Sequence, residues 1–150
     1  MHVDLENDLL ILLSDTSRHL RTYGDQLAQR MGMTRAQLII LARLERQPEL
    51  SQNELAELAE VAPITVARLI DRLEALGFVK RCTDPQDRRI WRLRLTRAAA
   101  PVLRQIRLYR AKLNRILTED IDPAVLDAMT VGLRQMKDNV SRRRLAEAAA

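Results

Sequence analysis

The sequence predicts a mainly α-helical protein of six helices with a small two- or three-stranded β-wing, arranged as a dimeric winged helix-turn-helix. Two short helical segments separated by a brief interruption precede a pair of short strands, which is the order of elements in that architecture. Longer helical segments flank this block on both sides. We expect residues 34–96 to form the winged lobe, and residues 1–33 and 97–150 to form a helical dimerisation lobe intertwined with it.

The two helices before the motif are predicted from apolar periodicity and capping residues. Leucines at helical spacing predict a helix over residues 5–29, in which Gly24 should be a weak point costing about 1 kcal/mol relative to alanine. Thr34 and Gln37 match a capping box, in which each side chain bonds the other residue's backbone, so the second helix should begin there. It should end before Pro48, because the residue preceding a proline disfavours helical geometry.

The helix-turn-helix itself is predicted over residues 51–77. Ser51 and Glu54 match a second capping box, which should start its first helix. Pro63 suits the first turn of the following helix, and Gly77 should end that helix. Four apolar residues at helical spacing should face the core: Val66, Leu69, Ile70 and Leu73.

The opposite side of this second helix should carry Thr65, Arg68 and Arg72. A hydroxyl and two guanidinium groups suit the major groove of DNA, where arginine bonds guanine bidentately and threonine contacts a base edge or a methyl group. A solvated helix face with an ion pair between Asp71 and Arg68 is an equally good interpretation of this helix alone.

Two strands are predicted after the helix, over residues 78–82 and 91–95. The second strand alternates strictly, with Trp91, Leu93 and Leu95 on one face and Arg92 and Arg94 on the other. Such a ribbon after a helix-turn-helix is a wing, and we place a wing here.

Arginines stand at the tip of the loop that joins these strands. Arg88 or Arg89 could enter the minor groove of DNA, where narrow A·T tracts attract cations. Asp87 is well placed to orient Arg89 through a charge-assisted hydrogen bond. Between residues 62 and 96, eight lysines and arginines stand against four acids, a net +4 out of the chain's formal +5. This concentration of charge favours a polyanionic partner such as double-stranded DNA.

Two further helices are predicted after the wing. Thr96 should cap a helix reaching residue 117, in which Pro101 lacks a backbone donor and could kink the second turn. Asp122 and Pro123 mark the start of the last helix, and the arginine run 142–144 with the alanine-rich tail should fray. This last helix carries an apolar stripe: Leu126, Met129, Leu133, Met136 and Val140. Burial within one monomer would explain the stripe equally well, but the additional apolar surface of the first helix favours a dimer built from both ends of the chain.

The stretch from the second helix of the motif to the end of the wing resembles the MarR family of bacterial winged-helix transcriptional regulators. The resemblance rests on residues 68–74 (RLIDRLE), 77–79 (GFV), Arg81, 84–89 (DPQDRR) and 93–96 (LRLT). It implies dimers on pseudo-palindromic operators, with residues of the recognition helix and wing touching DNA. A glycine often follows the Leu-Thr pair in that family, whereas residues 97–100 here are RAAA, which should favour an uninterrupted helix start.

The predicted function is therefore a sequence-specific DNA-binding transcriptional regulator, acting as a ligand-responsive repressor on a pseudo-palindromic operator as a homodimer. The expected DNA contacts are Gln52, Asn53, Thr65, Arg68, Arg72, Arg88 and Arg89. His19 and Tyr23 are candidates to line a pocket for a small aromatic effector, which the resemblance places where the dimerisation helices meet the DNA-binding lobe, although such residues are more often ordinary interface or core members. The alternatives are an architectural or nonspecific DNA-binding protein without an effector, and a winged helix used for protein contact alone.

The sequence offers no pattern for catalysis, a cofactor or a metal. No Cys/His cluster accompanies His2 or His19, and no glycine-rich phosphate-binding loop is present. No apolar run approaches the ~20 residues of a membrane span, and no signal peptide is expected at the start. The single Cys82 excludes an internal disulfide, which fits a reducing cytoplasm, and it is more simply a strand residue than an oxidisable thiol.

Overall fold

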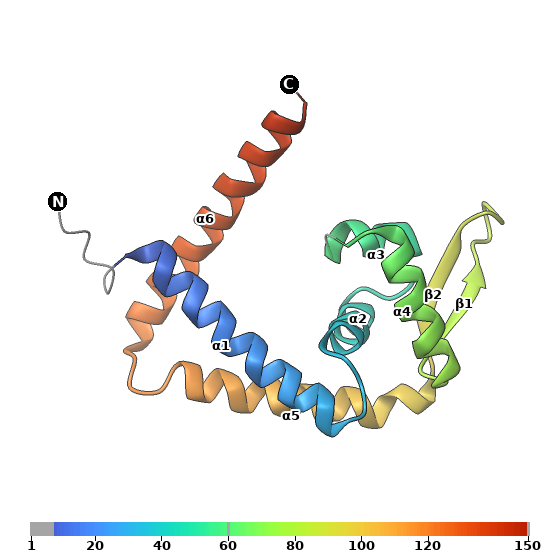
Figure 1. Ribbon diagram of the computed structural model, residues 1–150, viewed down its shortest axis with the longest axis horizontal. Coiled ribbons are helices and arrows are strands. Elements are labelled where there is room, and N and C mark those ends of the chain that lie inside the picture. Colours follow the sequence, from blue (N-terminus) through green and yellow to red (C-terminus); the bar gives the residue numbers. More distant parts are fainter. Residues whose placement is uncertain (1–7, 60, 150) are drawn as a thin grey trace. The chain divides into compact units, whose positions relative to one another are not determined.

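The computed structural model describes residues 8–59 and 61–149. The elements run in the order α1 (Leu9–Arg30), α2 (Arg35–Arg46), α3 (Gln52–Ala59), α4 (Pro63–Ala75), β1 (Val79–Thr83), β2 (Trp91–Leu95), η2 (Arg97–Ala99), α5 (Ala100–Leu117) and α6 (Pro123–Ala148) (Figure 1). The predicted combination of six α-helices with a small antiparallel sheet is confirmed for the described residues. The chain forms two compact units, one ending at Tyr109 and the other beginning at Arg110.

Both predicted capping boxes are present. The amide of Gln37 donates to Oγ1 of Thr34 (3.3 Å), and the amide of Thr34 donates to Oε1 of Gln37 (2.8 Å). The same reciprocal pair joins Glu54 to Ser51, with distances of 3.1 Å and 2.7 Å. These bonds satisfy amides that have no partner inside the first helical turn, so α2 and α3 begin where the sequence predicts.

Helix α1 begins after Asp8, whose carboxylate accepts hydrogen bonds from the amides of residues 10 and 11. The predicted start at residue 5 and the side chain of His2 lie outside the described residues. A Cβ atom at Gly24 would lie 2.9 Å from Cδ of Arg35. Arg35 in turn pairs with Asp25 at 2.9 Å. The glycine that looks like a weak point in the sequence therefore gives the first side chain of α2 room to cross α1.

One apolar core joins the helices of the first unit to its sheet. Its fully buried members include Leu41, Leu44, Leu55, Val66, Ile70, Leu73, Val79 and Leu93. Of the four residues of α4 predicted to face inward, three are buried, and Leu69 is partly buried against the same cluster. Burial of each such side chain contributes about 1.5–3 kcal/mol, so this core fixes α3, α4 and the strands relative to one another.

Helix α4 ends in a Schellman motif at Gly77. Gly77 has a φ of 78°, its amide donates to the carbonyl of Glu74 (2.9 Å), and the amide of Phe78 donates to that of Leu73 (3.0 Å). The use of the Phe78 amide here explains why β1 begins one residue later than predicted.

Strands β1 and β2 form a two-stranded antiparallel hairpin alongside α4 (Figure 1). Val79 lies opposite Leu95, and Thr83 lies opposite Trp91. The segment before α3 adds an isolated bridge between Ser51 and Arg92 rather than a full third strand. We call this hairpin, with its connecting loop, the wing.

The transition from the wing to α5 differs from the prediction. Thr96 makes no side-chain cap; its hydroxyl donates to the carbonyl of Gly77, and its amide donates to that of Phe78. Residues 97–99 form a 3₁₀ turn, and α5 begins at Ala100. The helical segment therefore begins with a 3₁₀ turn that continues directly into α5. Pro101 lies in the first turn of α5, where its missing N–H is not needed.

Helix α6 starts as predicted, since the Asp122 carboxylate accepts a hydrogen bond from the amide of Ala124 (2.8 Å) and Pro123 follows it. The helix continues to Ala148, so the predicted fraying is wrong for residues 142–144. An ion pair between Arg143 and Glu147, one helical turn apart at 2.9 Å, supports this end. No described residue of α6 is buried, and its apolar stripe is exposed or half-exposed.

Gly77→Ala should lower the free energy of unfolding by about 1–2 kcal/mol, because a Cβ atom disfavours the left-handed backbone at this position. Gly77→Asn is the matched variant, and it should lose less because asparagine tolerates this conformation better. Thermal or denaturant unfolding followed by circular dichroism measures both. Equal losses for the two variants would contradict a backbone origin of the effect.

Candidate nucleic-acid interface

Helix α4 presents a polar face away from the core. Thr65, Arg68 and Arg72 are all exposed, on the side opposite the buried stripe. Ile64 is also exposed on this helix, to 64%, and the sequence analysis overlooked it. Ile64 does not fall on the periodic stripe of buried residues, and an apolar residue outside that stripe cannot reach the core. Its exposure could have been predicted from this position.

The acidic residues of α4 are bound by an arginine from the wing. Nη2 of Arg81 lies 2.6 Å from Oδ1 of Asp71, and its Nη1 lies 2.6 Å from Oε2 of Glu74. The same guanidinium donates to the side-chain oxygen of Gln52 and to the carbonyl of Ala67, both at 3.3 Å. Only 19% of the Arg81 side chain is exposed, so this arginine ties β1 to both helices of the motif.

The ion pair considered between Asp71 and Arg68 is absent, because Asp71 pairs with Arg81 instead. Within the described residues, no ion pair involves Arg68 or Arg72. The guanidinium groups on the outer face of α4 thus carry charge that no described carboxylate offsets, and such charge suits binding to a polyanion.

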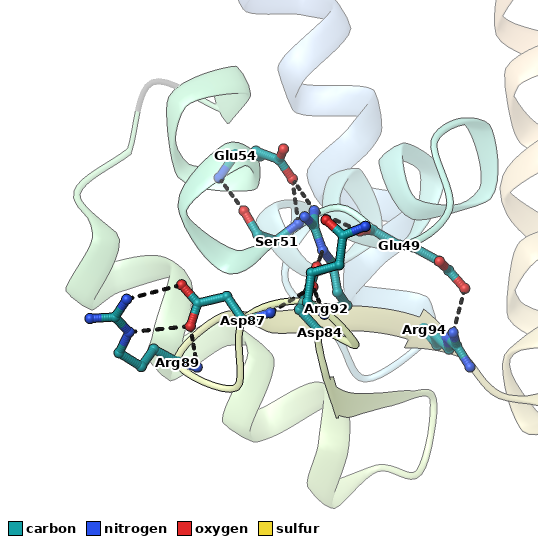
Figure 2. A network of polar contacts seen from close by, with 9 residues as sticks. Glu49, Ser51, Glu54, Asp84, Asp87, Arg89, Arg92 and Arg94 are labelled. Carbon is teal, nitrogen blue, oxygen red and sulfur yellow. Dashed lines mark hydrogen bonds and ion pairs between the residues drawn. The ribbon is translucent and has the colours of Figure 1, made fainter.

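Two aspartates organise the loop of the wing. Oδ1 of Asp84 accepts hydrogen bonds from the amides of Gln86 (2.7 Å) and Asp87 (3.1 Å). Asp87 accepts from the amide and Nε of Arg89 through one oxygen, at 3.0 and 3.2 Å, and from Nη2 through the other, at 3.4 Å (Figure 2). The side chain of Arg89 is nevertheless 91% exposed. The loop therefore holds a solvent-facing arginine in a defined orientation, and Arg88 beside it is also exposed.

Hydrogen bonding lowers the pKa of each carboxyl group in this network. For Asp84 the Arg92 side chain is the largest cause, followed by the amides of Gln86 and Asp87. For Asp87 the amide of Arg89 is the largest, followed by its side chain. The pKa of Glu54 is lowered mainly by the amide and hydroxyl of Ser51. All three groups are therefore charged near neutral pH.

Arg92 and Arg94 connect the wing to the segment before α3. Arg92 contacts Asp84 through Nε (2.7 Å), and Glu54 through Nη1 (2.9 Å) (Figure 2). Arg94 pairs with Glu49 at 2.6 Å. Among the expected DNA contacts on α3, Asn53 is exposed, whereas Gln52 is partly buried and already accepts the hydrogen bond from Arg81.

The positive charge of this region is therefore only partly available to a partner. Four of its eight cations form ion pairs inside the protein: Arg81, Arg89, Arg92 and Arg94. The remaining four have no such pair in the described part of the chain: Arg68, Arg72, Lys80 and Arg88. The net charge counted from the sequence is correct, but the structure concentrates its unpaired part on the outer face of α4 and on the wing.

A second group of residues lies on α1 and α5, in the unit that ends at Tyr109. His19 and Tyr23 are exposed on α1. The hydroxyl of Tyr109 is the one buried side-chain polar atom without a hydrogen-bond partner in the described residues. Burial raises the pKa of Tyr109, and the nearby Tyr23 raises it further. The sequence analysis did not single out Tyr109, because a tyrosine on a helix gives no local indication that its hydroxyl is orphaned.

Other kinds of site find no support in the described residues. No group of three or more His, Cys, Asp or Glu side chains there could hold a metal ion. None of the described helices is long and apolar enough to cross a membrane. Cys82 is a free, half-buried thiol on β1.

A helix-turn-helix followed by an arginine-tipped hairpin defines a winged helix-turn-helix protein. Residues 31–90 match the model of the MarR family. This match confirms, over these residues, the resemblance to MarR-type transcriptional regulators noted in the sequence.

Individual relatives agree with this assignment. The uncharacterized HTH-type transcriptional regulator YybA of Bacillus subtilis (strain 168) is 25% identical over 136 residues, covering 91% of each chain. The HTH-type transcriptional repressor MdtR of the same organism is 40% identical over 68 residues, which are 45% of this chain and 44% of the repressor. A crystal structure of MarR superposes with a TM-score of 0.79 at 29% identity, covering 96% of this chain and 98% of that one.

Asp84→Asn should reduce the dependence of stability on acid pH. A carboxyl group with a lowered pKa stabilises the fold above its unfolded-state pKa, and that contribution disappears as the pH falls through the folded-state value. Thermal unfolding of both proteins between neutral pH and about pH 3 should show a shallower acid decline for the variant. Parallel declines would mean that Asp84 is not one of the groups responsible.

Proposed function

We propose that this regulator is a homodimeric, sequence-specific repressor that binds a pseudo-palindromic operator and responds to a small ligand. The observation that carries the proposal is the outer face of α4. There, Arg68 and Arg72 form no ion pair with any residue that the structure describes, while Arg81 pairs with both acidic residues of the same helix. Two related proteins support the part of the proposal that concerns repression and DNA binding. MdtR is named a repressor, and a structure of S. aureus MepR in complex with DNA superposes with a TM-score of 0.79 at 21% identity.

In this proposal α4 is the recognition helix in the major groove. Thr65 and Arg68 would meet base edges, with Arg72 beside them, because arginine bonds guanine bidentately and threonine bonds an edge or packs on a methyl group. Ile64, exposed next to Thr65, adds an apolar surface of the kind that suits a thymine methyl.

The wing and the start of α3 would make the remaining contacts. Arg88 and Arg89 would lie in or beside the minor groove, whose narrow A·T tracts attract arginine. Gln52 and Asn53, in the first turn of α3, would lie near phosphates, where unpaired amides and the helix dipole favour negative charge. Phosphate contacts of this kind position the protein, while the contacts of α4 specify the sequence.

A dimer would supply the second DNA-binding lobe. The apolar stripe of α6 repeats at heptad-like spacing, and in this helix no described residue is buried. Burying such a stripe against a second copy is the usual way to remove it from water. We therefore retain residues 34–96 as the DNA-binding lobe, and residues 1–33 with 97–150 as the dimerisation lobe. A two-fold axis would place the two recognition helices about one DNA turn apart.

Tyr109 supports the proposal of an effector site beside His19 and Tyr23. A buried hydroxyl without a partner costs free energy, and a small aromatic or phenolic ligand could satisfy it. One related structure concerns regulation by such a compound. It describes control of DNA binding by 6-hydroxynicotinic acid in BpsR of Bordetella bronchiseptica, which superposes with a TM-score of 0.77 at 22% identity.

Arg68→Ala should relax sequence preference and weaken binding to the preferred duplex by about 1–3 kcal/mol, because a bidentate base contact is lost. Selection from random DNA followed by gel-shift titration measures both quantities. Arg46→Ala, which removes an exposed arginine from the last turn of α2, is the charge-matched control. Unchanged selectivity in the Arg68 variant would contradict its assignment. A wild-type chain that binds all duplexes alike would favour the alternative, a nonspecific DNA-binding protein.

Leu133→Asp should dissociate the dimer and abolish tight binding to an inverted repeat, because it places a charge in the apolar stripe of α6. Val131→Asp is the matched control, since Val131 is exposed on the same helix but lies off the stripe. Sedimentation or light scattering gives the mass of each protein. A Leu133 variant with the mass of the wild-type dimer would refute this interface.

A further inference from the structure

Arg92 lies near the start of β2, and its guanidinium contacts two different parts of the candidate interface at once. It is 28% exposed, and Figure 2 shows it between the capping box of α3 and the loop of the wing. Its Nη1 is engaged by Glu54 and by the carbonyl of Glu49, and its Nε by Asp84. These contacts span 38, 43 and 8 residues of sequence, respectively.

On one side, Arg92 holds the beginning of α3. The oxygen of Glu54 that it contacts at 2.9 Å also accepts the Ser51 amide at 2.7 Å, so the same carboxylate caps the helix and binds the wing. A backbone bridge between Ser51 and Arg92 reinforces this junction. Glu49, whose carbonyl accepts the third hydrogen bond at 3.3 Å, has a left-handed φ of 66°. Arg92 thus helps to hold a backbone conformation that a glutamate disfavours.

On the other side, Arg92 holds the loop of the wing. Its Nε lies 2.7 Å from Oδ2 of Asp84, whose other oxygen binds the amides of Gln86 and Asp87. Asp87 in turn holds the backbone and guanidinium of Arg89. The Asp84 side chain is only 11% exposed, so little water competes for these bonds. A continuous series of hydrogen bonds therefore runs from the cap of α3 to the exposed arginine of the loop.

We propose that Arg92 is a positioning residue that makes the start of α3 and the tip of the wing a single rigid DNA-binding element. The inference rests on the proposed function, because it concerns how Arg89 is held for the contact assigned to it there. A two-stranded hairpin alone is a weakly stable structure, so the orientation of its tip depends on such an attachment. Arginine suits this role because its planar fork binds two carboxylates in fixed directions, whereas lysine offers a single flexible ammonium group.

Double-mutant cycles on the full chain test this positioning role. The probe is a duplex recovered by selection from random DNA with the wild-type protein. Arg92→Lys keeps the charge and should weaken binding about tenfold, because Arg89 is no longer held in place. The same change should have little effect in an Arg89→Ala background, yet should retain its full effect in an Arg68→Ala background. Arg94→Lys, the neighbouring basic residue on the same face of β2, is the matched control and should show no coupling to Arg89.

Hydrogen exchange on the free protein provides a second readout. The amides of Gln86 and Asp87 should exchange faster in Arg92→Lys, while the buried amides of α4 remain protected. Asp84→Asn breaks the same series of bonds at the other end and should show the same coupling to Arg89, which keeps the test decisive if Arg92→Lys does not fold.

Two results would overturn the inference. These are equal losses of binding in both backgrounds, as a direct DNA contact by Arg92 would give, and unchanged exchange at the loop. A wild-type chain without sequence preference would instead refute the proposed function, and the exchange data would still decide whether Arg92 holds the loop.

Discussion

The geometry of the interface depends on how the acidic residues of the motif and wing are neutralised. Arg81 forms ion pairs with both acidic residues of α4, and Arg92 forms one with an acidic residue of α3 and one with an acidic residue of the wing. An unpaired carboxylate at this surface would repel DNA phosphates, and each of these is instead held by an inward-facing arginine. Arg68 and Arg72, on the outer face of α4, form no ion pair with any described residue, so their charge is not used in this neutralisation.

These ion pairs orient the elements more than they stabilise them. Exposed pairs contribute about 0–1 kcal/mol each, whereas the buried side chains shared by α2, α3, α4 and the sheet contribute more. The core decides that the wing packs beside α4, and the polar network decides where the tip of the wing points. Leu93 is fully buried, and the arginines on either side of it in β2 form ion pairs. One short strand therefore contributes both to the core and to the polar network.

The two compact units differ in how completely they bury their own apolar residues. The unit ending at Tyr109 contains the whole buried core, whereas α6 has no buried residue among those described. A helix with an exposed apolar stripe is incomplete by itself in water. This imbalance supports the proposed homodimer, in which a second copy would cover the apolar stripe of α6.

Most of the fold was predictable because its determinants are local. The caps at Thr34, Ser51 and Asp122 each bond an amide two or three residues further along the chain, and the glycine after α4 bonds a carbonyl three residues before it. Apolar periodicity places the elements between them. The polar outer face of α4 was predictable for the same reason, since it lies opposite a periodic buried stripe.

Only the tertiary structure decided which arginines form ion pairs within the protein. Arg81 and Arg92 look like other cations in the sequence, and their partners lie up to 38 residues away among many equivalent carboxylates. Thr96 failed as a cap because its hydroxyl and amide bond the chain at Gly77 and Phe78 instead. Local sequence sets the elements because helix and turn energetics are short-ranged, whereas pairing of charges depends on which side chains the folded core brings together.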